Sequence, residues 1–232
     1  MHVRATPTRT RPPTRRSTGS RPVVVTAAAL VLSLVALLTG CSSSESAAPE
    51  EPVGYTRSPV RSVAGQSLPV AGGPAEPLPL AAPKGGLRLL FLGFTSCPYE
   101  CPTTLTNLKR AVQQLPEQDR GRVSVGLVSV DLVRDTPDRL TGFVGDVLSG
   151  STPKGVGLLA ADDAALRQVT GALGASYSAT PNADGTPNIT HTDEVYAVDD
   201  QGDVVRQWPF DAPPRALAAE LGQLLAGNRS LG

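Results

Sequence analysis

Two cysteines with the spacing C-x-x-x-C, Cys97 and Cys101, follow the apolar run 87–94, and a proline comes after each of them. On a helix, residues four apart lie on one face with Cβ atoms about 5–6 Å apart. A disulfide needs Cβ atoms nearer to about 3.8 Å, whereas a metal ion that bridges two thiolates tolerates the wider separation. The spacing therefore favours a metal site, although a disulfide stays within reach if the first helical turn adjusts.

The predicted position of this pair, at a junction from strand to helix, favours reactive sulfur. The free amides and partial positive charge of a helix N-terminus stabilise thiolates, which both metal binding and disulfide exchange require. We therefore expect both sulfurs to be activated. A structural disulfide is the alternative in an exported protein, but a bridge that closes so short a loop constrains little of the unfolded chain.

Few other donors for a soft metal are present. Beyond residue 40, His191 is the only histidine, and the one methionine is Met1. Soft thiolates select Cu(I), and imidazole also suits Cu(II), so two cysteines and one histidine favour copper. Zinc in structural sites takes four protein ligands, and no fourth is evident in the sequence.

The elements that must position these residues alternate between strands and helices. Such alternation predicts parallel strand pairing with right-handed crossovers. The sequence thus predicts an α/β fold with a mostly parallel central sheet, a C-terminal β-hairpin and flanking helices, which resembles the thioredoxin fold. Strands are expected at 87–94, 122–131, 156–160, 193–199 and 203–208, helices at 101–115, from 136–137 onward, 162–173 and 213–225, and a loop at 175–190. In a thioredoxin-like fold, the start of strand 193–199 faces the cysteine loop, which would bring His191 near the pair.

Three segments of the chain resemble signatures of the Sco/SenC copper proteins. Residues 95–102 read T-S-C-P-Y-E-C-P against T-x-C-P-D-x-C-P, and residues 129–137 read S-V-D-L-V-R-D-T-P against S-V-D-P-x-R-D-T-P. The third is His191 before a strand that ends in D-x-x-G, here Asp199 to Gly202. The chain departs from the family at Tyr99, where the pattern has an acid, and at Leu132, where it has a proline.

The resemblance implies a thioredoxin-fold protein that binds Cu(I) and Cu(II) through Cys97, Cys101 and His191. It also implies a metallochaperone, rather than an enzyme, that helps to assemble the CuA centre of cytochrome c oxidase subunit II, with other extracytoplasmic copper donors as further partners. The alternative is a thiol–disulfide oxidoreductase that keeps the CuA cysteines reduced. The two hypotheses differ at His191, because copper needs a third ligand whereas exchange needs only the cysteines.

Asp131 is a further candidate at this site. It ends the predicted strand beside the cysteine strand, and the carboxyl ends of parallel strands meet at one edge of a sheet. It could therefore serve as a weak fourth ligand or as an outer-shell acceptor. The alternative, which we favour, is that Asp131 caps the following segment together with Arg134 and Asp135.

The N-terminal residues predict export and anchoring. Six arginines and no acid precede residue 22, the apolar run 23–38 follows, and L-T-G-C ends at Cys41. This pattern is typical of a secretory signal, and it resembles a bacterial lipoprotein signal, which implies lipidation of Cys41. A run of 16 residues is short for a membrane-spanning helix of about 20.

We therefore expect three regions along the chain: a signal peptide at 1–40, a lipidated cysteine and flexible tether at 41–83, and the copper-binding domain at 84–232. The tether is rich in Ser, Pro, Ala, Gly and Glu, with a short strand expected near 61–70. The domain would be held at the extracytoplasmic face of the bacterial cell membrane. Without the signal, 15 basic residues stand against 21 acidic ones, a net charge of about −6, which argues against nucleic-acid binding.

Overall fold

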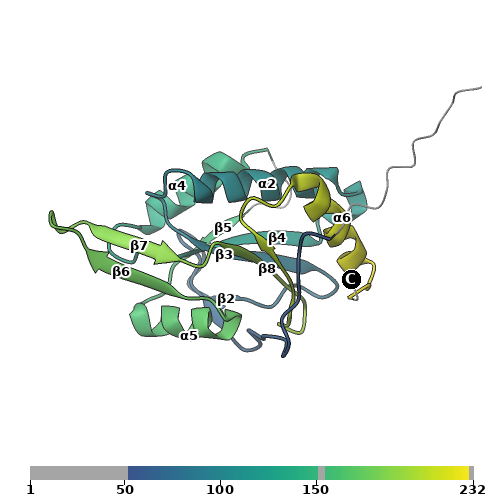
Figure 1. Cartoon of the computed structure of the whole chain (residues 1–232), viewed down its shortest axis with the longest axis horizontal. Helices are drawn as coiled ribbons and strands as arrows, with labels where there is room; N and C mark the ends of the chain where they lie inside the picture. The colour runs from purple at the N-terminus through teal and green to yellow at the C-terminus, as the bar shows by residue number, and fades with distance from the viewer. Residues whose placement is uncertain (1–51, 151–154, 230–232) are drawn as a thin grey trace, which may run out of the picture. The chain divides into compact units, whose positions relative to one another are not determined.

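A computed structural model describes residues 52–150 and 155–229 (Figure 1). A five-stranded sheet with the order β5-β4-β3-β8-β9 forms its centre. β3, β4 and β5 are parallel, and β8 and β9 continue the sheet antiparallel. This arrangement confirms the predicted α/β fold with its C-terminal hairpin. The strands are β3 (Leu87–Gly93), β4 (Val123–Ser129), β5 (Val156–Leu158), β8 (Glu194–Val198) and β9 (Val204–Pro209).

Helices cover both faces of this sheet. Figure 1 shows α2, α4 and α6 on one side and α5 on the other. Every residue of β3 is buried, as expected for a central strand covered on both faces. Leu89 and Phe91 belong to the core under α2, α4 and α6, while Leu90 and Leu92 belong to the core on the α5 side. The helices are α2 (Glu100–Gln114), the short α3 (Glu117–Arg120), α4 (Pro137–Leu148), α5 (Asp163–Leu173) and α6 (Pro214–Leu225).

Local signals explain where two of these helices begin. The side chain of Thr136 accepts a hydrogen bond from the amide of Arg139 at the start of α4, where a proline follows Thr136. The side chain of Asp162 accepts one from Ala165 at the start of α5. Both contacts satisfy amides that have no partner within the helix, and both helices begin where the sequence predicted them.

The expected loop at 175–190 is instead a β-hairpin. β6 (Tyr177–Pro181) pairs antiparallel with β7 (Pro187–His191) in a two-stranded sheet of its own, which projects from one end of the domain in Figure 1. Most of its side chains are exposed, so it lacks the alternation of apolar and polar residues by which strands are recognised. The Asp184-Gly185 pair, with φ +82° at the glycine, is typical of a hairpin turn and could have predicted this hairpin from the sequence.

The expected flexible tether is wrong for residues 53–83, because this segment packs on the domain. Val63, Leu68 and Leu80 are each at most 2% exposed. β1 (Ser67–Leu68), within the short strand expected near 61–70, pairs with β2 (Leu78–Pro79). Isolated bridges join the segment to Gln207 and Asp203 at the β9 edge and to Leu158 in β5. The physical reason is that edge strands leave unpaired amides and carbonyls, which this segment satisfies.

The start of the described chain is also fixed. The Glu220 carboxylate on α6 accepts hydrogen bonds from the amides of Val53 (2.8 Å) and Gly54 (3.1 Å). Its other oxygen accepts from Arg206 (2.6 Å) and Trp208 (3.1 Å). The domain therefore begins near residue 53 rather than at 84. The predicted signal and Cys41 lie outside the described residues, within which no helix is long and apolar enough to cross a membrane.

Candidate metal site

The two cysteines meet where β3 passes into α2. Cys97 and Cys101 are both buried and both carry free thiols. The amide of Cys101 donates a hydrogen bond to Cys97 Sγ at 3.3 Å. The N-cap residue, Tyr99, makes no side-chain hydrogen bond to this helix, and the Cys97 sulfur satisfies one of the amides that the first turn leaves free. The predicted placement of the pair at a strand-to-helix junction is confirmed.

Gly93, the last residue of β3, makes room for the pair. A Cβ at this position would lie 2.6 Å from Cys101 Sγ and 2.8 Å from Leu127 Cδ1. Only glycine therefore allows the thiol to pack against the end of the strand. Sequence reasoning missed this role, although a glycine that ends an apolar run just before a C-x-x-x-C motif is a usable signal.

Burial changes the chemistry expected of Cys101. It raises the pKa of the Cys101 thiol well above the ordinary value, and the hydrogen bond with Cys97 raises it further. The expectation that the helix N-terminus activates both sulfurs is therefore wrong for Cys101, because desolvation of the thiolate outweighs the helix field. A bound cation, which removes the proton of a coordinating thiol outright, would reverse this preference.

His191 lies beside the same helix N-terminus. It lines a narrow crevice that also includes Cys101, Glu100 and Asp193. Its Nδ1 is 2.9 Å from the carbonyl oxygen of Thr192. Because a carbonyl only accepts, Nδ1 carries the hydrogen, and the lone pair of the neutral ring is on Nε2. Fixing one ring nitrogen on a backbone carbonyl is how proteins prepare the other for a metal.

The three expected ligands are only partly brought together. The structure places Cys97 beside Cys101 and places His191 in a crevice with Cys101. Across residues 52–150 and 155–229, however, no three His, Cys, Asp or Glu side chains form a group that could hold a metal ion as they stand. His191 ends a strand of the separate β6–β7 sheet, and its ring packs edge-on against Phe94, 6.0 Å between ring centroids. The donor chemistry fits copper, but ligation by all three requires His191 to close on the cysteines.

Asp131 makes the capping contacts expected of it. Its side chain is 1% exposed and forms an ion pair with Arg134. The same carboxylate accepts a hydrogen bond from the amide of Arg134 at 3.1 Å. These contacts support the alternative that we favoured from the sequence.

Asp135 connects the cysteine loop to β4. It is buried, and its carboxylate accepts hydrogen bonds from the amide of Thr95 (3.2 Å), the hydroxyl of Thr95 (2.6 Å) and the hydroxyl of Ser129 (2.7 Å). The first two family-like motifs thus meet through one carboxylate. Sequence reasoning considered Asp135 only as a cap, because nothing local shows that residues 40 apart are in contact.

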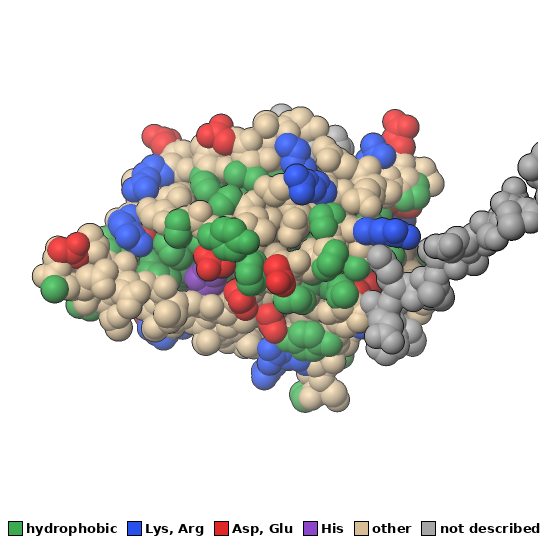
Figure 2. All heavy atoms as spheres, turned by 45° about the horizontal axis from the view of Figure 1, so that its top comes forward, with side chains coloured by type: hydrophobic (Ala, Val, Ile, Leu, Met, Phe, Trp, Pro, Cys, Tyr) green, Lys and Arg blue, Asp and Glu red, His purple; other side chains and the backbone are tan. Residues whose placement is uncertain are grey.

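Glu100 was also missed as a site residue. Its Oε2 accepts a hydrogen bond from the Cys97 thiol at 3.3 Å. The pKa of Glu100 is below its ordinary value because its own backbone amide and this thiol both donate to the carboxylate. Figure 2 shows acidic side chains gathered beside the histidine. An acid within the C-x-x-x-C motif was the signal in the sequence.

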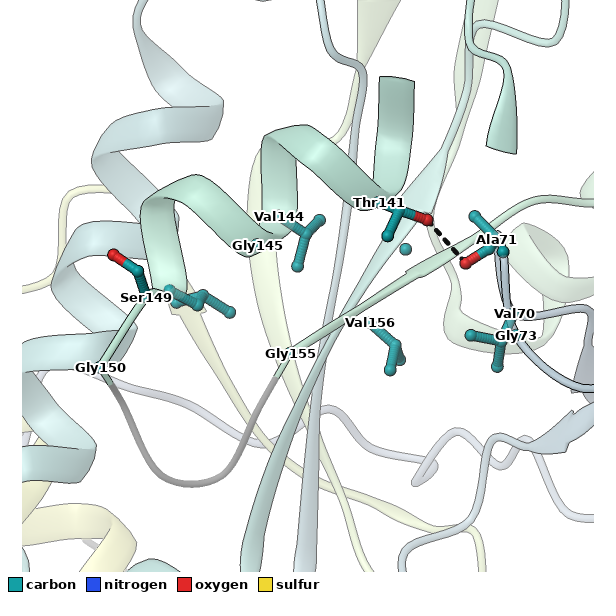
Figure 3. A pocket seen from close by; sticks show the side chains of 13 residues that line it. Val70, Ala71, Gly73, Thr141, Val144, Gly145, Ser149, Gly150, Gly155 and Val156 are labelled. Carbon is teal, nitrogen blue, oxygen red and sulfur yellow. Dashed lines mark hydrogen bonds between the residues drawn. The ribbon is translucent and has the colours of Figure 1, made fainter. Parts of the chain in front are cut away.

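A second pocket lies away from these residues. It has a volume of about 530 Å³ and is formed by α4, β5 and residues 70–73 (Figure 3). Val144 and Val156 line it, and Thr141 Oγ1 donates to the carbonyl of Ala71 at 2.7 Å. Among the described residues that line this pocket, none has a titratable or sulfur-bearing side chain.

Comparison with known proteins gives consistent matches. The family model described as SCO1/SenC matches residues 75–226. Protein SenC of Rhodobacter capsulatus is 31% identical over 140 residues, which is 59% of each chain. A SCO2-like protein of Rickettsia felis is 30% identical over 147 residues, which is 62% of this chain and 67% of that protein. The chain thus spans about 60% of the length of several curated relatives.

Solved structures match over a larger share of their length. Copper-bound ScoI of Bradyrhizobium japonicum is 27% identical with a TM-score of 0.57, covering 68% of this chain and 96% of that one. Apo Sco1 of Thermus thermophilus is 29% identical with a TM-score of 0.55, covering 72% and 94%. These matches support the thioredoxin-like fold predicted from the order of strands and helices.

Proposed function

Because this chain belongs to the SCO1/SenC family, we propose that it is a copper-binding metallochaperone that helps to assemble the CuA centre of cytochrome c oxidase subunit II. The observation that carries the proposal is the pair of free, buried thiols at the start of α2, with an imidazole in the adjoining crevice. Solved relatives with copper bound, such as ScoI of Bradyrhizobium japonicum, support the choice of metal.

Cys97, Cys101 and His191 Nε2 would hold the copper ion. Thiolate ligands suit Cu(I), and the imidazole extends the site to Cu(II). The Nδ1 contact with Thr192 orients the ring for this role. Ligation by all three residues would require the imidazole of His191 to approach the two sulfurs.

The position of the protein in the cell is part of the proposal. A lipid on Cys41 would hold the domain at the extracytoplasmic face of the membrane, where the client subunit and other copper donors are reached. With the domain starting near residue 53, residues 42–52 remain as the connection. Fully extended, these 11 residues reach at most about 40 Å, which would hold the start of the domain within that distance of the membrane.

The second candidate function is thiol–disulfide exchange. The two free thiols at one helix N-terminus favour it. In that reaction Cys97 and Cys101 become a disulfide while a disulfide of the client is reduced to two thiols, and a thiol reductant must then restore the pair. The raised pKa of Cys101 argues against attack by this sulfur, since the thiolate is the nucleophile.

Replacement of His191 separates the two functions. We expect His191→Ala to abolish the thiolate-to-Cu(II) charge-transfer absorption, because imidazole completes the Cu(II) site. Some Cu(I) binding should remain, since two thiolates can hold it, and disulfide reduction should be nearly unchanged. Anaerobic Cu(I) titration, Cu(II) absorption titration and a disulfide-reduction assay on one preparation measure these effects, with Cys97→Ser as the control that should lose both activities. A full Cu(II) spectrum in His191→Ala would mean that His191 is not a ligand.

A further inference from the structure

Glu100 is an acid placed directly against the cysteine pair. It is the residue before Cys101, and its carboxylate accepts the hydrogen of the Cys97 thiol at 3.3 Å. It also lines the crevice that contains Cys101 and His191. The family pattern has an acid at the position of Tyr99. This chain has its acid one residue later, at Glu100.

The separation of the two atoms suits a shared metal ion. With a metal–sulfur distance of about 2.3 Å and a metal–oxygen distance of about 2.1 Å, two atoms 3.3 Å apart subtend an angle of roughly 95–100° at the metal. This is close to the angle between adjacent ligands in the tetragonal geometry that Cu(II) prefers. An ion bound to Cys97 Sγ could therefore bind Glu100 Oε2 with little movement of either group.

A simpler role must be distinguished from this one. Acids in the first turn of a helix are favourable in general, because they face the positive end of the helix dipole. That role requires only a negative charge near the amides. It does not require the carboxylate to touch a sulfur or to enter the coordination sphere of a metal.

We propose that Glu100 is an oxygen ligand of Cu(II), adjacent to Cys97 in the coordination sphere. The inference rests on the proposed copper-binding function. When the ion binds, the Cys97 proton leaves to solvent and the carboxylate exchanges its hydrogen bond with the thiol for a bond to the metal. Carboxylate oxygen is a hard ligand and Cu(I) prefers soft ones, so Glu100 stabilises Cu(II) over Cu(I) and lowers the reduction potential of the bound copper.

The test compares copper binding by variants of the full chain, purified in detergent. Glu100→Gln keeps the shape and removes the charge, and Glu100→Asp keeps the charge but shortens the reach. Glu117→Gln, at the start of the short helix α3, is the matched control for the loss of one negative charge. The measurements are the dissociation constants of Cu(II) and Cu(I), the electron paramagnetic resonance spectrum of Cu(II) and the potential of the bound copper.

We expect both Glu100 variants to bind Cu(II) about tenfold more weakly and to alter its resonance spectrum, with Cu(I) affinity and the control close to wild type. A tenfold change in the ratio of the two affinities corresponds to about 59 mV for one electron, here toward a more positive potential. Thermal unfolding of the apo proteins verifies that the variants fold.

Three results would overturn the inference while leaving copper binding intact. The first is an unchanged Cu(II) spectrum and affinity in Glu100→Gln. The second is an equal loss in Glu117→Gln, which would show an effect of net charge alone. The third is wild-type behaviour of Glu100→Asp beside a weakened Glu100→Gln, which would show that charge near the helix suffices. Absence of copper binding in the wild-type chain would instead overturn the proposed function, and this inference with it.

Discussion

Replacing Asp135 by alanine removes the carboxylate that ties the cysteine loop to β4. The amide and hydroxyl of Thr95 and the hydroxyl of Ser129 all lose an acceptor. Ser129 is fully buried, so water cannot replace the lost partner there. Because each buried polar group left unsatisfied costs about 1–3 kcal/mol, we expect the free energy of unfolding of the reduced apo protein to fall by about 2–4 kcal/mol.

The assay can use a reporter that the chain already contains. Trp208, the single tryptophan, is fully buried, so its fluorescence should follow urea unfolding in the presence of chelator and reductant. At about 2–4 °C per kcal/mol for a domain of this size, the melting temperature should fall by roughly 4–16 °C. The same variant should show faster modification of Cys97 by a thiol reagent, because the loop that carries this residue is loosened.

Asp138→Ala is the matched control, because Asp138 is exposed in the first turn of α4, the helix that begins two residues after Asp135. It should cost no more than the about 0.3–1 kcal/mol of a helix-dipole interaction. A loss of less than about 0.5 kcal/mol in Asp135→Ala, the range of ordinary surface substitutions, would refute the reasoning. It would mean that the Thr95 and Ser129 groups find other partners at no cost.

Two further predictions concern the packing of the cysteines and the anchor. Gly93→Ala places a Cβ against Cys101 Sγ and should lower the free energy of unfolding of the apo protein by about 1–3 kcal/mol, measured in urea. Gly121→Ala is the control, because a Cβ at that position meets open space, and it should not lower the stability. Equal stabilities of the two variants would show that the Cys101 thiol can shift freely. Cys41→Ser should release the protein from the membrane fraction without lowering its melting temperature, and a variant that stays in the membrane pellet would point to an anchor other than the lipid.

Local sequence determines much of this protein. The apolar runs of the central strands and the segments that begin helices at 136–137 and 162 are short-range features, and each predicted its element within a few residues. The cysteine pair is equally local, since Cys97 and Cys101 share a helix start. The three motifs in order were sufficient to predict the family that the comparisons show.

Contacts between distant residues determine the rest. Residues 53–83 read as a tether because their few apolar side chains are scattered among prolines and glycines, and only the edges of the sheet give them partners. The Asp135–Thr95 contact spans 40 residues, and no spacing rule predicts it. The pKa of Cys101 is likewise decided by burial. A helix start favours thiolate in any sequence, but only the packed core determines how much water is removed from the sulfur, and here that desolvation outweighs the helix field.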